Sequence, residues 1–194
     1  MFRTAAGNHW RLRDHLDAGL RARLGAIVAS EPVVEAFEAH PPAIEGYRAA
    51  LEEFAPVERE YRGPAFRFPD PLPDLAGDAI VVTAARFDLL REHFGWAIEE
   101  WDDIQPVTVT VEDGVAVSIC HSPALSDRAA EAGVFTAEVA RGRGHATAVV
   151  SLWARLVRDT GRLPMYSTTW ENAASRRVAA KLGVELYGED FHLE

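Results

Sequence analysis

The segment VTVTVEDGVAVSIC, residues 107–120, constrains the fold of this chain more than any other. Two runs rich in β-branched residues flank Asp113-Gly114, a dipeptide typical of the two-residue turns that join antiparallel strands. The segment therefore predicts a tight antiparallel hairpin. This hairpin places the middle of the chain in a sheet.

Apolar periodicity and turn residues predict the other elements around the hairpin. Further strands are expected at residues 79–83, 129–136 and 165–169, and as two short strands in 184–193 around Gly188-Glu-Asp190. A helix is expected at residues 84–94, with Phe87, Leu89, Leu90 and Phe94 inward. A second is expected through residues 146–157 with a stop at Gly161, and a third between a capping Asn172 and Gly183. The resulting order, β-α-β-β-β-α-β-α-β-β, predicts a mixed α/β sheet.

The N-terminal part of the chain has a different pattern. Leucines recur at helical spacing in residues 16–28, and a second helical piece follows at 46–54. Residues 56–73 are rich in proline, which favours a connection between two parts. We therefore expect a helical N-terminal extension, residues 1–74, and a main domain, residues 75–194.

Composition limits the classes of function. The 194 residues carry a formal net charge of −10, which argues against a nucleic-acid surface because binding phosphates takes clustered lysine and arginine. Cys120 is the single cysteine, so the chain holds no internal disulfide and no cysteine-based metal cluster. The seven histidines have no metal-ligand spacing, and no apolar segment reaches the length of a membrane span. We expect a cytoplasmic protein with no metal, no membrane association and no nucleic-acid partner.

The segment ARGRGHATAV, residues 140–149, is the strongest ligand-binding motif, because a strand pattern stops there and an amphipathic helix begins. The backbone N–H groups of residues 142–146 are the donors that a helix start leaves without partners, and the helix dipole adds positive potential. The two glycines would let an anion such as pyrophosphate approach the main chain, and the two arginines would add charge. The alternative is a tight strand-to-helix turn with solvated arginines.

These residues resemble the cofactor motifs of the GNAT N-acetyltransferase superfamily. Arg141-Gly-Arg-Gly-His-Ala146 resembles the R/Q-x-x-G-x-G/A motif that binds the acetyl-CoA pyrophosphate in that family. Residues 170–183 are similar to the family's N-x-x-S-x-x-x-A-x-K-L-G helix, and residues 133–136 stand where the family has the splayed strand that receives the pantetheine arm. The resemblance covers residues 79–194, is nearest to a poorly characterised bacterial branch, and includes no part of residues 1–74.

The resemblance implies an α/β fold with a mixed, mainly antiparallel sheet flanked by helices. It also implies acetyl-CoA as co-substrate and requires no metal. The residues implied in binding acetyl-CoA are Val134, Phe135, Thr136, Arg141, Gly142, Arg143, Gly144, His145, Ala146, Asn172 and Ser175.

Two residues are candidates for proton transfer. Glu131 enters a mostly apolar strand, where burial should raise its pKa as a general base requires. The alternative is an ion pair with an arginine at the strand edge.

The candidate general acid lies in the second motif. Many relatives have a tyrosine as general acid four residues before Gly183, but here that position is Ala179. One turn upstream, Ser175 or a water that it positions is expected to protonate the coenzyme A sulfur. The alternative is that Ser175 completes the helix cap begun by Asn172.

Other residues near these motifs have two interpretations each. His121 could also accept the amine proton, but its position beside Ser-Pro favours a loop residue. Cys120 need not be a nucleophile, because transfer in this family is direct, and we expect a small apolar filler. Trp96, Trp101 and Trp170 either wall an acceptor pocket or fill the core.

We therefore expect an N-acetyltransferase that moves an acetyl group from acetyl-CoA directly to a primary amine of a small molecule or peptide. Two alternatives have the same cofactor motifs: a non-catalytic acyl-CoA-binding or sensing module, and an acyltransferase that uses a longer acyl-CoA. The leucine-lined face of the extension is expected to cover the main domain or to form a homodimer contact.

Overall fold

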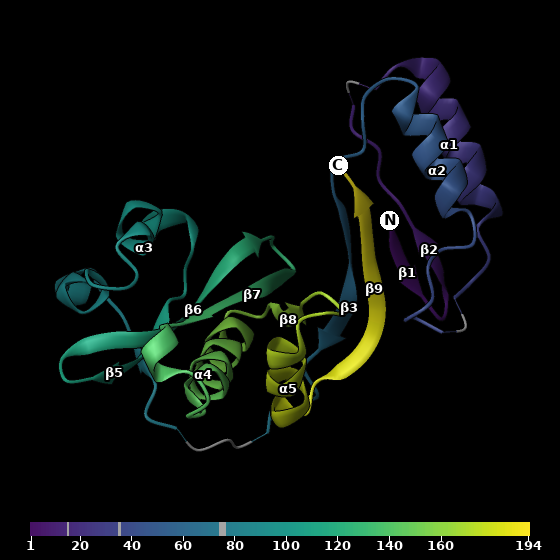
Figure 1. The fold of residues 1–194 in the computed structure, drawn as a ribbon. Coiled ribbons are helices and arrows are strands. Elements are labelled where there is room, and N and C mark those ends of the chain that lie inside the picture. The colour runs from purple at the N-terminus through teal and green to yellow at the C-terminus, as the bar shows by residue number, and fades with distance from the viewer. Residues whose placement is uncertain (15, 35, 74–76) are drawn as a thin grey trace. The chain divides into compact units, whose positions relative to one another are not determined.

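The computed structural model describes residues 1–194 except residues 15, 35 and 74–76, and its contacts divide the chain into two compact units (Figure 1). The larger unit comprises Phe66–Ser167 and Ala173–Glu185. The smaller unit comprises Met1–Ala65, Thr168–Asn172 and Leu186–Glu194. The predicted boundary between residues 74 and 75 lies outside the described residues, so the division into an extension and a main domain stays a prediction.

The larger unit is built on a sheet with the strand order β8-β7-β6-β5-β4. These strands are β4 (Ile80–Val81), β5 (Thr108–Glu112), β6 (Val115–Leu125), β7 (Ala129–Thr136) and β8 (Leu163–Ser167). The β7–β8 pair is parallel and the other neighbours are antiparallel. The predicted hairpin joins β5 to β6, with φ of 50° at Asp113 and 81° at Gly114. The mixed, mainly antiparallel sheet confirms the predicted fold class.

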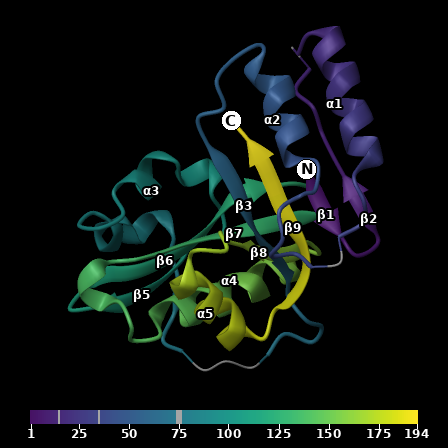
Figure 2. The same cartoon turned by 45° about the vertical axis from the view of Figure 1, so that its right-hand side comes forward.

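Helices cover both faces of this sheet (Figure 2). On one face lie α4 (His145–Asp159) and α5 (Ala173–Leu182). Their core residues Val150, Trp153 and Leu182 pack with Cys120, which is fully buried as expected for an apolar filler. On the other face lie the 3-10 segments η1 (Ala84–Leu90) and η2 (Trp101–Asp103) and the short α3 (Trp96–Glu99).

The prediction of a regular helix at residues 84–94 is wrong in its backbone. Residues Ala84–Leu90 form a 3-10 segment that is interrupted at Arg86, where φ is −124° and ψ is 26°. The predicted inward residues Leu89, Leu90 and Phe94 are nevertheless buried against the sheet. Because packing on the sheet outweighs local propensity here, the apolar pattern identifies the core residues but not the backbone conformation.

The smaller unit combines four strands with two helices. Its strand order is β2-β1-β9-β3, formed by β1 (Phe2–Thr4), β2 (Gly7–His9), β9 (Glu185–Leu193) and β3 (Glu60–Arg67). The predicted helices are α1 (Ala18–Ser30), capped by the Asp17 side chain, and α2 (Ile44–Glu52). They lie side by side, and a cluster of buried side chains packs them with Phe191 of β9: Leu20, Leu24, Val28, Tyr47 and Ala50 (Figures 1 and 2).

Residues 184–193 do not form the two short strands that were predicted. Glu185–Leu193 is one strand, β9, and Gly188 lies inside it. A Cβ at Gly188 would come within 2.4 Å of the Phe2 ring, so this glycine makes room for an aromatic side chain of β1 rather than forming a turn. No local pattern predicts β1, and without that partner Gly188 has the pattern of a turn residue.

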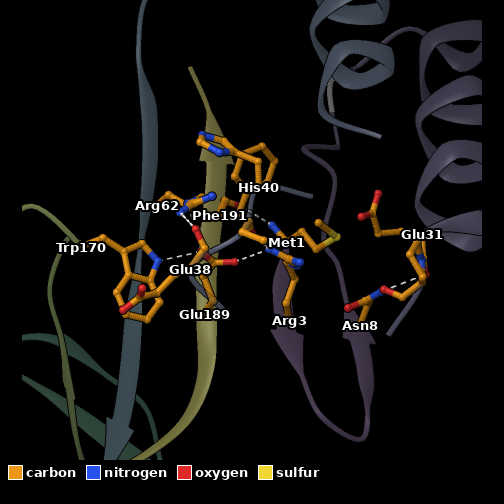
Figure 3. A network of polar contacts seen from close by, with 12 residues as sticks. Met1, Arg3, Asn8, Glu31, Glu38, His40, Arg62, Trp170, Glu189 and Phe191 are labelled. Carbon is orange, nitrogen blue, oxygen red and sulfur yellow. Dashed lines mark hydrogen bonds and ion pairs between the residues drawn. The ribbon is translucent and has the colours of Figure 1, made fainter. Parts of the chain in front are cut away.

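A buried carboxylate, Glu189, joins several segments of the smaller unit (Figure 3). Its side chain has no exposed surface and forms ion pairs with Arg3 of β1 and Arg62 of β3, the second at 3.1 Å. The indole N–H of Trp170 donates to the same carboxylate at 2.8 Å. Glu189 therefore connects β1, β3 and residues 168–172 to β9. Trp170 uses its polar atom in this network.

Candidate functional site

The parallel pair β7–β8 separates part way along its length. The two strands pair from Ala129 opposite Leu163 to Glu131 opposite Met165, and no further pairs join them among the residues that the structure describes. Strand β7 continues to Thr136, still paired with β6 through Thr136 opposite Ser118. Ser118 Oγ also donates to Phe135 O at 3.0 Å. The β8-facing edge of residues 132–136 is thus an open backbone edge, about 16 Å long at the usual rise of a strand.

The loop after β7 presents a row of main-chain donors. In the described part of the chain, the N–H groups of residues 142–146 make no hydrogen bond, and the first to do so is Thr147 N, 3.1 Å from Gly144 O. Gly142 and Gly144 have φ of 80° and 93°, and an added Cβ on either would meet nothing within 4 Å. Successive N–H groups around left-handed residues form an anion-binding nest, and the α4 dipole adds to its positive potential. The predicted loop therefore has the geometry of a pyrophosphate site.

The arginine and histidine side chains of this loop lie against protein groups. Arg143 Nη1 lies 3.0 Å from a carboxylate oxygen of Glu112, and its Nη2 donates to Val139 O at 3.0 Å. His145 Nε2 lies 3.1 Å from Glu112 Oε1, and Arg141 Nε donates to Thr136 O at 3.4 Å. Glu112 had no signal in the sequence beyond its place before the hairpin turn. An anion in the loop would share Arg143 and His145 with this carboxylate.

Ser175 has an unpredicted partner. It lies in the first turn of α5, and its Oγ is 2.6 Å from the phenolic oxygen of Tyr166 on β8. Tyr166 is 1 % exposed, and burial raises the pKa of its phenol. Ala179, which stands where many relatives have a tyrosine, is also buried in the core. The hydroxyl of Ser175 at this end of α5 therefore pairs with a buried tyrosine from β8.

The sheet face opposite α4 contains the candidate base. Ala130, Ala132 and Val134 pack with the α4 core, so the alternating residues Glu131 and Phe135 point to the other face. The Glu131 carboxylate accepts a hydrogen bond from Ser167 Oγ. Among the described residues no arginine forms an ion pair with Glu131. The carboxylate contacts the Ser167 hydroxyl instead of the arginine at the strand edge that the sequence offered as an alternative.

The expectation that His121 is a loop residue is wrong. His121 lies within β6, is 5 % exposed, and stands opposite Gly133, where a Cβ would come within 2.5 Å of its ring. Its ring centroid is 4.9 Å from that of Trp96 and 5.9 Å from that of Phe135. The strand continues past Pro123 because a bulge there removes the need for a ladder hydrogen bond.

The environment of His121 favours the neutral imidazole. Burial lowers its pKa, and a hydrogen bond with the Gly133 backbone opposes this only in part. Nδ1 is buried and has no hydrogen-bond partner in the described part of the chain. The His121 ring therefore lies, favoured in its neutral form, on the same sheet face as Glu131.

Every residue predicted to bind acetyl-CoA or to transfer a proton belongs to the larger unit except Asn172. Asn172 ends the segment Thr168–Asn172 of the smaller unit, and its N–H donates to Thr169 O at 3.2 Å. No group of three or more histidine, cysteine or acidic side chains converges as a metal site among the described residues. In the same residues, no helix is both long enough and apolar enough to cross a membrane.

Comparisons with known proteins identify the fold and the family. An acetyltransferase (GNAT) domain model matches residues 48–185. A GCN5-related N-acetyltransferase-like protein from Streptococcus suis superposes with a TM-score of 0.58 at 21% identity, covering 77% of this chain and 68% of that one. A GNAT-family protein from Novosphingobium aromaticivorans gives a TM-score of 0.59 at 17% identity, covering 71% and 65%. A GNAT-family acetyltransferase from Colwellia psychrerythraea gives 0.55 at 16% identity, covering 76% and 61%.

This chain thus spans about two thirds of the length of the solved structures that it resembles. No match to the chain was found among curated proteins. The family model covers well over half of the chain, and the solved structures have the same mixed sheet flanked by helices. The family implies acyl transfer from acetyl-CoA. The chain belongs to the GNAT acetyltransferase family.

Proposed function

We propose that this protein is an N-acetyltransferase that moves an acetyl group from acetyl-CoA to a primary amine of a small molecule or peptide. One observation carries the proposal: the open edge of β7 at residues 132–136 is followed, after the 3-10 segment Glu138–Ala140, by the N–H groups of residues 142–146, which make no hydrogen bond in the described part of the chain. An extended pantetheine arm needs main-chain partners along its length, and a pyrophosphate needs converging donors. The two features follow each other in the order that such a ligand requires.

In this proposal, the backbone of Val134, Phe135 and Thr136 holds the pantetheine arm, and residues 141–146 hold the pyrophosphate. Glu131 takes the proton that the amine loses as the new C–N bond forms. Its contact with Ser167 fixes the carboxylate on the sheet face opposite α4. Ser175 donates a proton to the sulfur as the C–S bond breaks, and it regains one from solvent. Asn172 remains a proposed ligand of the coenzyme.

The remaining features of the proposal concern the whole protein. We propose that residues 1–74 act as an extension of a domain formed by residues 75–194, and that the extension covers apolar surface or forms a homodimer contact. The lengths of α1 and α2 support a role that depends on packing against other segments, because isolated helices of their length are marginal in water. We propose a cytoplasmic location and no metal requirement.

The test is coenzyme A release from acetyl-CoA in the presence of a panel of amines: polyamines, aminoglycosides, amino acids and peptides with a free N-terminus. We expect at least one class to accelerate release, with Glu131→Gln as the matched inactive control. Binding of acetyl-CoA without accelerated release by any amine would favour a non-catalytic binding or sensing module. Faster release from butyryl-CoA than from acetyl-CoA would favour an acyltransferase for longer chains.

A further inference from the structure

Tyr166 is a buried titratable residue for which the proposed function has no role. It lies on β8 in the core of the larger unit, and its ring centroid is 6.4 Å from that of Phe66. Only 1 % of the residue is exposed. Its hydroxyl group nevertheless meets the hydroxyl of Ser175 at 2.6 Å. A buried phenol needs a hydrogen-bond partner, and this one uses a residue of the family's helix motif.

The chemistry of the two hydroxyls favours one direction for this hydrogen bond. A phenol is the stronger acid and therefore the better donor, whereas an aliphatic hydroxyl oxygen is the better acceptor. Burial raises the pKa of Tyr166, so the phenol keeps its hydrogen across the neutral range. With Tyr166 as donor, the Ser175 oxygen accepts, so the serine hydrogen is directed away from Tyr166. Accepting a hydrogen bond also makes the serine O–H a stronger donor.

We propose that Tyr166 is a positioning residue whose O–H donates to Ser175 Oγ and thereby directs the Ser175 O–H to the sulfur of coenzyme A. The inference rests on the proposed function, because it assigns Ser175 to the leaving thiolate. When the C–S bond breaks, its electron pair goes to sulfur, the Ser175 proton follows, and the serine is reprotonated by solvent. Tyr166 keeps its proton throughout. Tyr166 on β8 thus orients Ser175, in a chain that has Ala179 at the α5 position where many relatives have a tyrosine.

The test measures the thiol pKa of bound coenzyme A, which needs no acceptor. The ultraviolet absorbance of the thiolate is followed against pH in complexes of the parent, Ser175→Ala, Tyr166→Phe and the double variant. The acetyl-CoA complexes, whose sulfur cannot ionise, serve as blanks. Cys120 adds no signal, because burial raises its pKa well above the ordinary value. Tyr47→Phe is the matched control, since Tyr47 is another buried tyrosine with a hydrogen-bonded hydroxyl, 3.0 Å from Glu31.

We expect Ser175→Ala to raise the thiol pKa by about one unit or more, because a hydrogen bond to a charged group favours the charged form. Tyr166→Phe should raise it by part of that amount, and the double variant should match Ser175→Ala alone. Tyr47→Phe should leave it unchanged. If Tyr166 were only structural, Tyr166→Phe would alter stability or affinity, but its effect on the thiol pKa would not depend on the presence of Ser175.

Two results would overturn the inference while leaving the proposed function intact. In one, coenzyme A binds and Tyr166→Phe or Ser175→Ala has the parent thiol pKa. In the other, the double variant shifts the pKa further than Ser175→Ala, so the tyrosine acts independently. Ser175 is only half-buried, so Ser175→Ala should fold even if the core does not tolerate Tyr166→Phe. The serine variant therefore tests the inference on its own. Absence of coenzyme A binding by the parent would instead overturn the proposed function, and this inference with it.

Discussion

Replacing Glu189 with glutamine should strongly destabilise the smaller unit. The Glu189 side chain has no exposed surface, and its ion-pair partners Arg3 and Arg62 are 3% and 10% exposed in their side chains. Glutamine has almost the same volume, so the change creates no cavity. It removes the negative charge that pairs with both guanidinium groups, and it places an N–H₂ group, itself a donor, against the donors of Arg3, Arg62 and Trp170.

The magnitude follows from this burial. Breaking a buried ion pair by removing one partner costs about 3–5 kcal/mol, because the other charge stays buried without compensation. The Trp170 indole N–H can still donate to the remaining carbonyl oxygen, which places Glu189→Gln near the lower end of that range. With a urea dependence of about 1–3 kcal/mol/M, a loss of that size lowers the unfolding midpoint by roughly 1 M or more.

The assay is urea unfolding followed by circular dichroism, with Arg59→Ala as the control. Arg59 forms an ion pair with Glu194 in the same unit, but its side chain is 78% exposed. Exposed pairs contribute about 0–1 kcal/mol, so this variant should unfold close to the parent. If Glu189→Gln also unfolds within about 1 kcal/mol of the parent, the buried network is not a main source of stability and the reasoning fails.

Three further predictions concern the larger unit. Gly133→Ala should cost about 1–3 kcal/mol in unfolding free energy, because its Cβ would come within 2.5 Å of the packed His121 ring; parental stability would show that the ring has room to move. Because the pKa of His121 is lowered in the folded state, the unfolded state binds the proton more readily. The stability that His121 contributes is therefore present above about pH 6.5 and is lost as pH falls toward the folded-state pKa. Between pH 7 and 5, the free energy of unfolding should therefore fall less steeply in His121→Gln than in the parent, by up to about 1.4 kcal/mol per pH unit. An equal pH dependence in the two proteins would contradict the burial argument. Glu131→Gln should lower turnover about 10²–10⁴-fold with unchanged acetyl-CoA affinity, whereas full turnover would assign the base elsewhere.

The elements that the sequence predicts correctly are those with local signals. Asp113-Gly114 specifies its turn through backbone conformations that few other dipeptides tolerate. The start of α4 follows from two glycines with positive φ, and its end from Gly161 with φ of 80°. The periods of residues 16–28 and 46–54 likewise identify α1 and α2. In each case the information lies within a few residues, so one sequence suffices.

The features that the sequence does not predict depend on residues distant in the chain. Gly188 resembles a turn residue until the Phe2 ring is placed beside it. Glu112 meets Arg143 and His145 only after the hairpin has folded onto the start of α4. The partner of Ser175 comes from β8, and nothing in the helix motif refers to that strand. Such pairings have no local period or turn chemistry, so they follow from the fold alone.

The most direct test of the account is a calorimetric titration with acetyl-CoA of the parent, Gly144→Val and Gly161→Val. Gly144 and Gly161 have similar φ, 93° and 80°, and a Cβ on either would meet nothing within 4 Å, so the two variants carry similar backbone strain. They stand at opposite ends of α4, and only Gly144 belongs to the row of free N–H groups. We predict that the parent and Gly161→Val bind alike and that Gly144→Val loses at least about tenfold in affinity, or 1.4 kcal/mol. Absence of binding by the parent, or equal affinity of the two variants, would contradict it.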